Sequence, residues 1–203
     1  MKILIHGINF SPELTGIGKY SGEMAEWLIN AGHEVRVVTA PPYYPQWRIA
    51  VGHANRWRVC KEQAKGLTVY RCPLWVPSNP SGLKRVLHLA SFAMASLPVM
   101  LRQVAWRPDV VLAVEPPFFC APQAWLTARL SGAQAWLHIQ DFEIDAAFDL
   151  GLLRADWAKR WVLSFERFWL RRFDRISTVS ENAGETGRQG RAGGQDASLS
   201  QLG

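Results

Sequence analysis

Residues 2–39 read KILIHGINFSPELTGIGKYSGEMAEWLINAGHEVRVVT, and this stretch sets the pattern that the rest of the chain repeats. The apolar run at residues 2–6 ends at Gly7, as a buried parallel strand does. Residues 17–31 follow helical spacing up to Gly32, and residues 34–39 form a second apolar run. The helical spacing places four apolar side chains on one side of that helix: Tyr20, Met24, Trp27 and Leu28.

The same alternation continues along the chain. A loop rich in proline and aromatic residues, at 41–58, comes first. Further strands are predicted at residues 67–72, 109–114, 135–140 and 175–180, and further helices at 83–106, 118–130 and 156–173. Alternating strands and helices predict an α/β, doubly wound parallel sheet of the Rossmann-like kind, with helices on both faces.

Composition fits a single domain of this kind. The 203 residues are 48% hydrophobic and include ten Trp and nine Phe, more than a core needs, so we expect some aromatic side chains on a functional surface. The formal net charge of +6 suits anionic partners, namely nucleotide diphosphates, lipid phosphates or nucleic acid. Three cysteines without metal-ligand spacing and a start without a signal peptide predict a cytoplasmic protein with reduced thiols.

The sequence changes character after Asn182. Residues 183–203 hold six of the sixteen glycines, and no aromatic residue follows Phe173. We expect a folded domain over residues 1–182 and a disordered glycine-rich tail over 183–203. A natural flexible tail and the out-of-frame end of a longer reading frame both remain open for this segment.

The first strand–helix connection is the most informative for function. Gly16 and Gly18 lie where the helix begins, and free backbone N–H groups at a helix start favour phosphate. A tight turn is the plainer explanation. A P-loop is excluded because Glu13 and Tyr20 stand where it needs Gly and Ser or Thr. A nicotinamide site is disfavoured because the second strand lacks an acidic residue near its end at Thr39.

Several motifs in order resemble family 4 of the retaining glycosyltransferases, in particular its colanic-acid and exopolysaccharide branch. They cover roughly residues 1–182 and are Ser11-Pro12-Glu13, Thr15-Gly16-Ile17-Gly18-Lys19-Tyr20, Ala31-Gly32-His33-Glu34-Val35, Arg107-Pro108-Asp109-Val110-Val111, Leu137-His138-Ile139-Gln140-Asp141-Phe142-Glu143-Ile144-Asp145 and Ile176-Ser177-Thr178-Val179-Ser180-Glu181.

This resemblance implies a GT-B fold, in which two Rossmann-like domains face each other across a cleft. The amino-terminal domain receives the acceptor, the carboxy-terminal domain holds the nucleotide sugar, and no separate cofactor or metal is needed. The present chain resembles only the first of these domains. We therefore expect a chain derived from an enzyme that transfers hexosyl or fucosyl groups to a lipid-linked saccharide, inactive without the carboxy-terminal domain.

The resemblance also suggests site residues. It maps Gly16 and Gly18 onto the segment near the donor diphosphate. Many family members carry a His-Asp pair after the fifth strand, and here Gln140 takes the His position beside Asp141. Gln can bind a sugar hydroxyl but cannot shuttle a proton, so positioning is the expected role. His138, on the same strand face, is either a third member of this site or a satisfied, half-buried histidine.

Acidic residues cluster after the same strand. Asp141, Glu143, Asp145 and Asp149 suit sugar hydroxyls, because ligands bind at the carboxyl ends of parallel strands. A solvated loop is the second interpretation and a metal site a distant third. Glu115 ends another strand. Ser180 and Glu181 either cap a following helix or line the cleft.

Two segments raise the question of a membrane. Residues 86–101 carry no formally charged side chain but are fewer than the about 20 residues that span a bilayer. They form either a buried crossover helix or a shallow membrane contact. Residues 156–173 interleave aromatic and basic residues, which suits an anionic membrane surface as well as a core helix with a solvated basic face.

Three functions follow as alternatives. The first is the glycosyltransferase, with a nucleotide sugar, a lipid-linked saccharide acceptor and the inner face of the plasma membrane as partners, and no nucleic acid. The second is a non-catalytic remnant that binds an acceptor or a membrane surface. The third is a nicotinamide-linked oxidoreductase, for which we expect no response to NADH.

Overall fold

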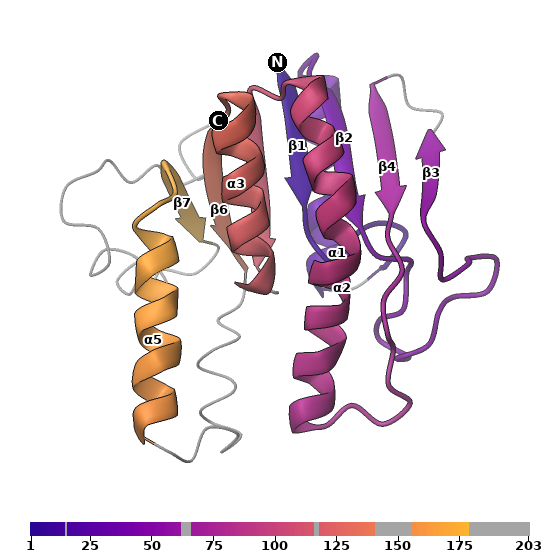
Figure 1. Ribbon diagram of the computed structural model, residues 1–203. Helices are drawn as coiled ribbons and strands as arrows, with labels where there is room; N and C mark the ends of the chain where they lie inside the picture. Colours follow the sequence, from indigo (N-terminus) through magenta and orange to yellow (C-terminus); the bar gives the residue numbers. More distant parts are fainter. Residues whose placement is uncertain (15, 62–65, 116–117, 141–155, 179–203) are drawn as a thin grey trace.

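The computed structural model describes residues 1–14, 16–61, 66–115, 118–140 and 156–178. Their backbone forms a seven-stranded sheet with helices on both faces (Figure 1). In chain order the elements are β1 Lys2–His6, α1 Gly16–Asn30, β2 Glu34–Thr39, β3 Arg58–Lys61, β4 Leu67–Arg71, α2 Gly82–Gln103, the 3-10 turn Val104–Trp106, β5 Val110–Glu115, the 3-10 turn Phe118–Cys120, α3 Ala121–Ser131, β6 Gln134–Ile139, α5 Asp156–Leu170 and β7 Arg175–Thr178.

The strand order in the sheet is β3-β4-β2-β1-β5-β6-β7, and the six strands other than β3 run parallel. The predicted doubly wound parallel sheet is therefore confirmed. One strand was not expected. Residues 58–61, placed at the end of a loop and in the stretch before the next strand, form β3, which pairs antiparallel with β4 at the edge of the sheet.

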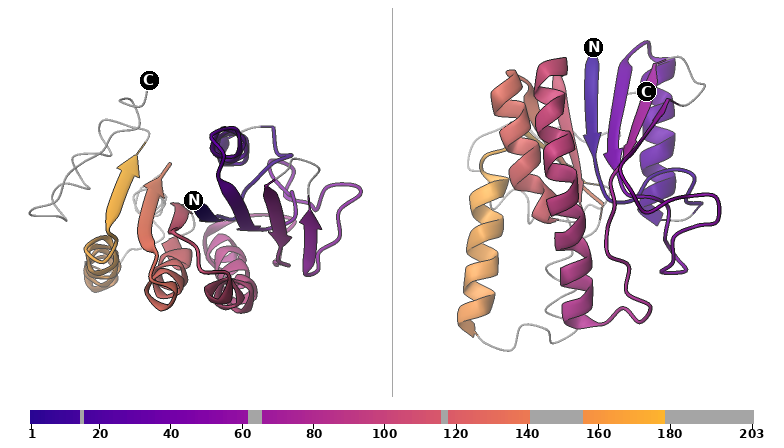
Figure 2. Two further views of the ribbon diagram at one scale, coloured as in Figure 1. Left: turned by 90° about the horizontal axis from the view of Figure 1, so that it is seen from above. Right: turned by 45° about the vertical axis from the view of Figure 1, so that its right-hand side comes forward.

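The helices form two unequal layers. Seen from above in Figure 2, α1 lies on one face of the sheet, and α2, α3 and α5 lie together on the other. Each face has its own core. Side chains such as Leu4, Val111 and Leu137 pack with Phe92 of α2. On the other face, side chains such as Ile5 and Val37 pack with Ala25 of α1.

Helix α1 meets the sheet through small residues. Its buried residues are Gly18, Ser21 and Ala25, while Met24 and Leu28 pack against the margin of the core. Tyr20 and Trp27 are more than half exposed, at 58% and 56%. Helical spacing places Tyr20 and Trp27 on the side of α1 opposite to Gly18, Ser21 and Ala25, so these two rings lie in solvent.

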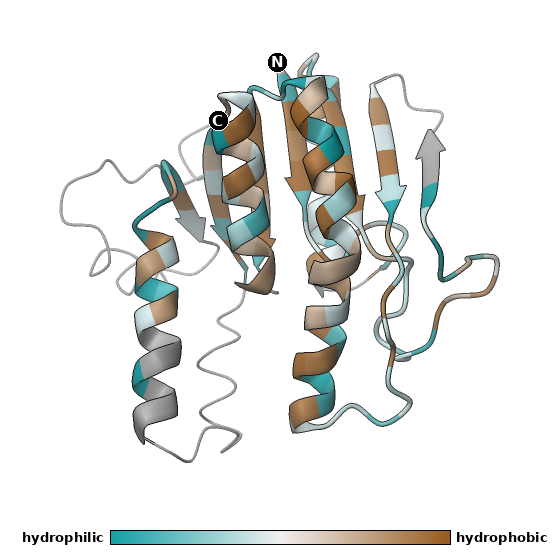
Figure 3. Ribbon diagram, viewed as in Figure 1, coloured by the Kyte–Doolittle hydropathy of each residue, from teal (hydrophilic) through white to brown (hydrophobic). Residues whose placement is uncertain are grey.

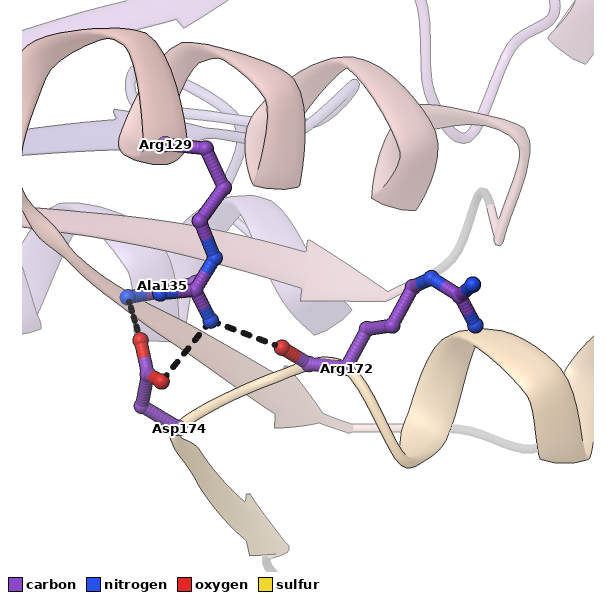
Figure 4. A network of polar contacts seen from close by, with 4 residues as sticks. All are labelled: Arg129, Ala135, Arg172 and Asp174. Carbon is purple, nitrogen blue, oxygen red and sulfur yellow. Dashed lines mark hydrogen bonds and ion pairs between the residues drawn. The ribbon is translucent and has the colours of Figure 1, made fainter.

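The turn between α5 and β7 is fixed by polar contacts (Figure 4). Arg129 Nη2 of α3 donates to Oδ1 of Asp174 at 2.9 Å and to the backbone oxygen of Arg172 at 3.2 Å. The other carboxylate oxygen of Asp174 accepts from the backbone N–H of Ala135 at 2.8 Å. One side chain thus ties α3, β6 and the start of β7 together.

Candidate site at the carboxyl edge of the sheet

The carboxyl ends of the six parallel strands meet at one edge of the sheet. The chain runs from β1 to β2 and β4 on one side, and then to β5, β6 and β7 on the other. Ligands of open α/β sheets bind at the point where the strand order reverses, here between β1 and β5. Gly7 follows β1 at this point, and a Cβ there would lie 3.1 Å from Cβ of Val114, so a glycine lets the chain leave β1 close beside β5.

The start of α1 depends on two glycines for different reasons. Gly16 has a φ of +59° and open space around it, so it serves the backbone conformation of the turn into the helix. Gly18 is buried, and a Cβ there would lie 2.6 Å from both Cβ and Oε2 of Glu13. The predicted pair therefore does lie at the helix start, where Gly18 makes room for a neighbouring carboxylate.

Glu13 joins the loop after β1 to the loop after β2. Its Oε1 accepts from the backbone N–H groups of Tyr43 at 3.0 Å and Tyr44 at 3.1 Å, and its Oε2 accepts from Asn9 Nδ2 at 2.8 Å. Burial raises the pKa of this carboxyl above its usual value, while these bonds and the charge of Arg71 act in the opposite direction. Glu13 therefore acts as a buried acceptor that holds two site loops in place.

Arg71, the last residue of β4, binds the backbone of the same two loops. It is 5% exposed, its Nη1 donates to the backbone oxygen of Ala40 at 2.8 Å, and its Nη2 donates to the backbone oxygen of Ser11. Neither Glu13 nor Arg71 was predicted as a site residue. The available signal for Glu13 was its place in the Ser11-Pro12-Glu13 motif, and that for Arg71 was a charged residue near the end of the strand predicted at 67–72.

His6, the last residue of β1, is buried rather than open to a ligand. Its Nε2 lies 3.1 Å from Ser96 Oγ, and its ring stacks on Phe92 with 5.7 Å between centroids. Gln123 Nε2 donates to the same Ser96 Oγ at 3.0 Å. Complete burial lowers the pKa of His6 to about 3. The imidazole is therefore neutral, and it joins the end of β1 to helix α2 through Ser96 and Phe92.

His138 and Gln140 occupy different surroundings. His138 is buried, and its Nδ1 lies 2.9 Å from Ser177 Oγ, which also accepts from Trp136 Nε1 at 2.8 Å. Burial lowers the pKa of His138. Gln140 follows β6, and its backbone N–H donates to the backbone oxygen of Glu115 at 3.2 Å. Its buried Oε1 has no hydrogen-bond partner among the residues that the structure describes.

The structure thus brings together two of the predicted site residues. Glu115 ends β5 and Gln140 directly follows the neighbouring β6, both beside the switch point, and Glu115 is 2% exposed. Gly16 and Gly18 lie on the other side of β1, at the start of α1. The remaining predicted residues lie outside the described residues, as does the predicted tail over 183–203; they are Asp141, Glu143, Asp145, Asp149, Ser180 and Glu181.

A hollow of about 700 Å³ lies at the same edge, between the loops that follow β2 and β4. Trp47, Trp75 and the polar side chains of Gln46, Arg48 and Ser78 are among its lining residues. Asn55 fixes the two loops, because its Nδ2 donates to the backbone oxygen of Leu74 at 2.7 Å and its Oδ1 accepts from the Leu74 N–H at 3.0 Å. Flat aromatic walls with a few polar groups suit a small polar ligand with apolar faces.

The part of the chain that the structure describes holds no group of three or more His, Cys, Asp or Glu side chains placed to bind a metal ion. Cys72 and Cys120 are buried, and burial raises the pKa of the Cys72 thiol to about 12. These two cysteines are therefore packing residues.

Comparison with known proteins decides the family. Residues 15–193, most of the chain, match the model of the glycosyl transferase 4-like domain. The chain belongs to this family. The resemblance to this family that the motifs indicate is confirmed.

A curated relative of this glycosyl transferase 4-like chain is a protein of Escherichia coli (strain K12) provisionally named the colanic acid biosynthesis glycosyl transferase WcaI. The two are 52% identical over 185 residues, which cover 90% of this chain and 45% of the relative. The chain thus spans less than half the length of this relative.

Solved structures agree on the fold. Sucrose-phosphate synthase from Thermosynechococcus elongatus matches 98% of this chain with a TM-score of 0.66 and 13% identity. The catalytic domain of starch synthase IV from Arabidopsis thaliana, bound to ADP and acarbose, matches 93% with a TM-score of 0.58 and 16% identity. The chain covers 47% and 48% of these proteins. The fold is therefore the Rossmann-like domain of GT-B glycosyltransferases.

Proposed function

We propose that this chain is the acceptor-side half of a retaining glycosyltransferase that acts on a lipid-linked saccharide in exopolysaccharide biosynthesis of the colanic-acid type. The family and the 52% identity to the E. coli protein support the reaction class. The observation that carries the proposal is the carboxyl edge itself, where loops held by Glu13 and Arg71 border an aromatic hollow and the β1–β5 switch point.

The hollow is the proposed site of the acceptor saccharide. Trp75 is half-exposed and offers a ring face on which a sugar can stack, while Gln46, Arg48 and Ser78 can bind hydroxyl groups. Trp47, which also lines the hollow, is held in place by two neighbouring rings: its centroid lies 5.7 Å from that of Tyr43 and 5.1 Å from that of His88. A rigid aromatic wall of this kind loses little entropy on binding.

The proposed roles at the switch point concern positioning. The backbone at Gly16 and Gly18 approaches the donor diphosphate, where helix-start N–H groups favour negative charge. Gln140 and Asp141 orient sugar hydroxyls with help from Glu115, Glu143, Ser180 and Glu181. His138, already bonded to Ser177, supports Gln140 from the strand. Transfer then relies on holding donor and acceptor in reacting geometry.

Catalysis requires a donor-binding half in this proposal. The chain matches 45% of its E. coli relative. We propose that the nucleotide sugar binds to a domain corresponding to the rest of that length. We therefore expect the 203-residue chain alone to transfer little or no sugar. No cofactor beyond the nucleotide-sugar substrate is assigned.

The test is complementation. The 203-residue chain is mixed with the part of the E. coli relative that lies outside the matched segment, and sugar transfer from labelled nucleotide sugars to a membrane extract is measured. We expect transfer only with both halves present, and its loss with Trp75→Ala but not with Trp27→Ala, an exposed tryptophan on the opposite face. Robust transfer by the chain alone would contradict the proposal.

One observation favours a second candidate, a non-catalytic module that binds an acceptor or a membrane surface. Gln140 stands where the resemblance implies a histidine, and an amide cannot shuttle a proton. In that case the complemented mixture would bind the acceptor without transferring sugar.

A further inference from the structure

Helix α2 carries an apolar stripe on its outer side. Its buried side chains, among them His88, Phe92 and Met100, face the sheet. The opposite side presents five large apolar side chains at successive spacings of four, seven, three and four residues, which place them on one face of a helix. The stripe consists of Leu83, Leu87, Met94, Leu97 and Leu101. Leu83 and Met94 are 72% and 71% exposed, so the fold itself leaves them uncovered.

The neighbouring helix α3 carries two further exposed apolar side chains. Helices α2 and α3 pack side by side in the layer in front of the sheet (Figure 1). Leu126 and Leu130 are exposed on α3. In Figure 3 the hydrophobic colour recurs along both helices. We call the stripe together with Leu126 and Leu130 the outer apolar face. Clusters of exposed large apolar side chains mark a binding surface for a protein or a membrane.

The charged side chains that α2 and α3 themselves carry are all basic. Neither α2 nor α3 contains an acidic residue. Lys84 and Arg85 stand at one end of the stripe and Arg102 at the other. Helix α1 on the opposite face of the sheet differs, because its exposed Tyr20 and Trp27 lie among Glu23 and Glu26. Of the two helices, only α2 combines exposed apolar side chains with basic residues and no acidic ones.

A basic hollow of about 480 Å³ adjoins the Leu101 end of the stripe. Arg36, Arg58 and Arg102 line it together with Trp57, and its described lining residues include no acidic side chain. Trp57 is mostly exposed, and its Nε1 donates to the backbone oxygen of Ala95 on α2 at 3.1 Å. Arginines beside an exposed tryptophan are the groups that contact phosphate and the interface region of a bilayer.

We propose that the outer apolar face docks on the surface of a bilayer that contains anionic phospholipids. The stripe enters the boundary between headgroups and acyl chains, while Lys84 at one end and Arg58 and Arg102 at the other contact lipid phosphates. None of the helices in the described ranges is long and apolar enough to cross a membrane. Helix α2, about 33 Å long at its 22 residues, lies along the surface.

Docking in this way has a consequence for the site. The amino-terminal end of α2 lies beside the saccharide hollow, because Trp47 of its lining packs on His88 and Arg85 lies 5.5 Å from the Trp47 ring. A saccharide carried on a lipid would therefore enter the hollow from the membrane on which α2 lies. This consequence rests on the proposed function, whereas the docking itself does not.

The experiment is vesicle flotation of the 203-residue chain. Vesicles of phosphatidylcholine alone and of phosphatidylcholine mixed with phosphatidylglycerol are compared. We expect the chain to float with the mixed vesicles, and the double variant Leu87→Ser with Met94→Ser to lower its partition by about tenfold or more, because two apolar side chains no longer enter the lipid. Arg58→Glu with Arg102→Glu should lower binding to the mixed vesicles only.

Trp27→Ser on α1 is the matched control, since its side chain is as exposed as that of Leu87 but lies on the opposite face. It should float like the unaltered chain, and all variants should keep the same melting temperature. Failure of the chain to float, or flotation that the α2 variants leave unchanged, would overturn the proposal. So would binding lost only through Arg171→Glu with Arg172→Glu after α5, or self-association in sedimentation that the α2 variants abolish. Flotation involves no sugar transfer, so its outcome is independent of complementation.

Discussion

At the scale of single residues, three of the five histidines are interior groups. His6 and His88 are 0% exposed and His138 is 4% exposed. Burial lowers the pKa of each, that of His6 to about 3. An imidazole whose folded pKa lies below its unfolded value binds fewer protons in the folded state. Its contribution to stability is therefore complete above the unfolded pKa, near 6.5, and is lost as the pH falls toward the folded pKa.

This predicts acid destabilisation between about pH 6.5 and pH 3, with a slope from His6 of at most about 1.4 kcal/mol per pH unit. His6→Gln can still hydrogen-bond Ser96 but does not titrate, so it should flatten the dependence of unfolding free energy on pH. Urea unfolding across this range provides the measurement. His53→Gln, at an exposed loop position, is the control. An equal slope in the unaltered chain and in His6→Gln would refute the assignment.

At the scale of elements, the fit between α1 and the loop after β1 determines the geometry of the candidate site. Gly22 repeats the relation seen at Gly18, because a Cβ there would lie 3.0 Å from Cβ of Ser11. The loop therefore lies against two glycines of the helix. Glu13 can then reach the N–H groups of Tyr43 and Tyr44 in the next loop. Local packing in one βα unit thus sets the position of a second loop at the carboxyl edge.

We expect Gly18→Ala to destabilise the fold by about 1–3 kcal/mol through overpacking against Glu13. In a Glu13→Gly background this cost should shrink, because the atoms that clash are gone. Gly16→Ala is the control, since it has only the backbone cost of a left-handed conformation, about 1–2 kcal/mol, and no neighbour within 4 Å. Unfolding in urea of the single and double variants gives the coupling. Strict additivity for Gly18→Ala would show that the steric explanation is wrong.

At the scale of the whole molecule, the sheet has two wings that meet at β1 and β5. The wing of β2, β4 and β3 supports the saccharide hollow, and the wing of β6 and β7 supports Gln140. Asp174 fastens the outermost strand of the second wing through the N–H of Ala135 and the guanidinium of Arg129 (Figure 4). Asp174 is distant in sequence from both Arg129 and Ala135, so it joins elements that are separated along the chain.

Asp174→Ala should therefore lower the free energy of unfolding by about 1–3 kcal/mol, because a backbone donor and a guanidinium lose their acceptor. Glu23→Ala on α1 is the comparison. Glu23 lies 3.8 Å from Lys19 on an exposed helix surface, and removal of such a pair changes stability by no more than about 0.5 kcal/mol. Equal effects of the two substitutions in urea unfolding would show that Asp174 is no anchor.

Much of this architecture follows from local patterns. Apolar runs ending at Gly7 and Thr39, and their repetition along the chain, predict the six parallel strands and the helices between them. The periodicity has this power because a parallel strand buried on both faces must be apolar throughout. The motifs predict the family, which the comparisons confirm. The position of Gln140 at the carboxyl edge follows from strand direction alone.

Tertiary structure decided the rest. Strand β3 pairs antiparallel with β4 because β4 offers free backbone groups at the edge of the sheet. The Arg-Val-Cys-Lys sequence of β3 lacks the apolar alternation that would have predicted a strand. Tyr20 and Trp27 lie in solvent because α1 packs on the sheet through Gly18, Ser21 and Ala25, on its other side. Glu13 and Arg71 act together across 58 positions of sequence, a distance over which no local pattern carries information. Periodicity reports which side of an element is apolar, whereas contacts between distant elements depend on how closely those elements pack.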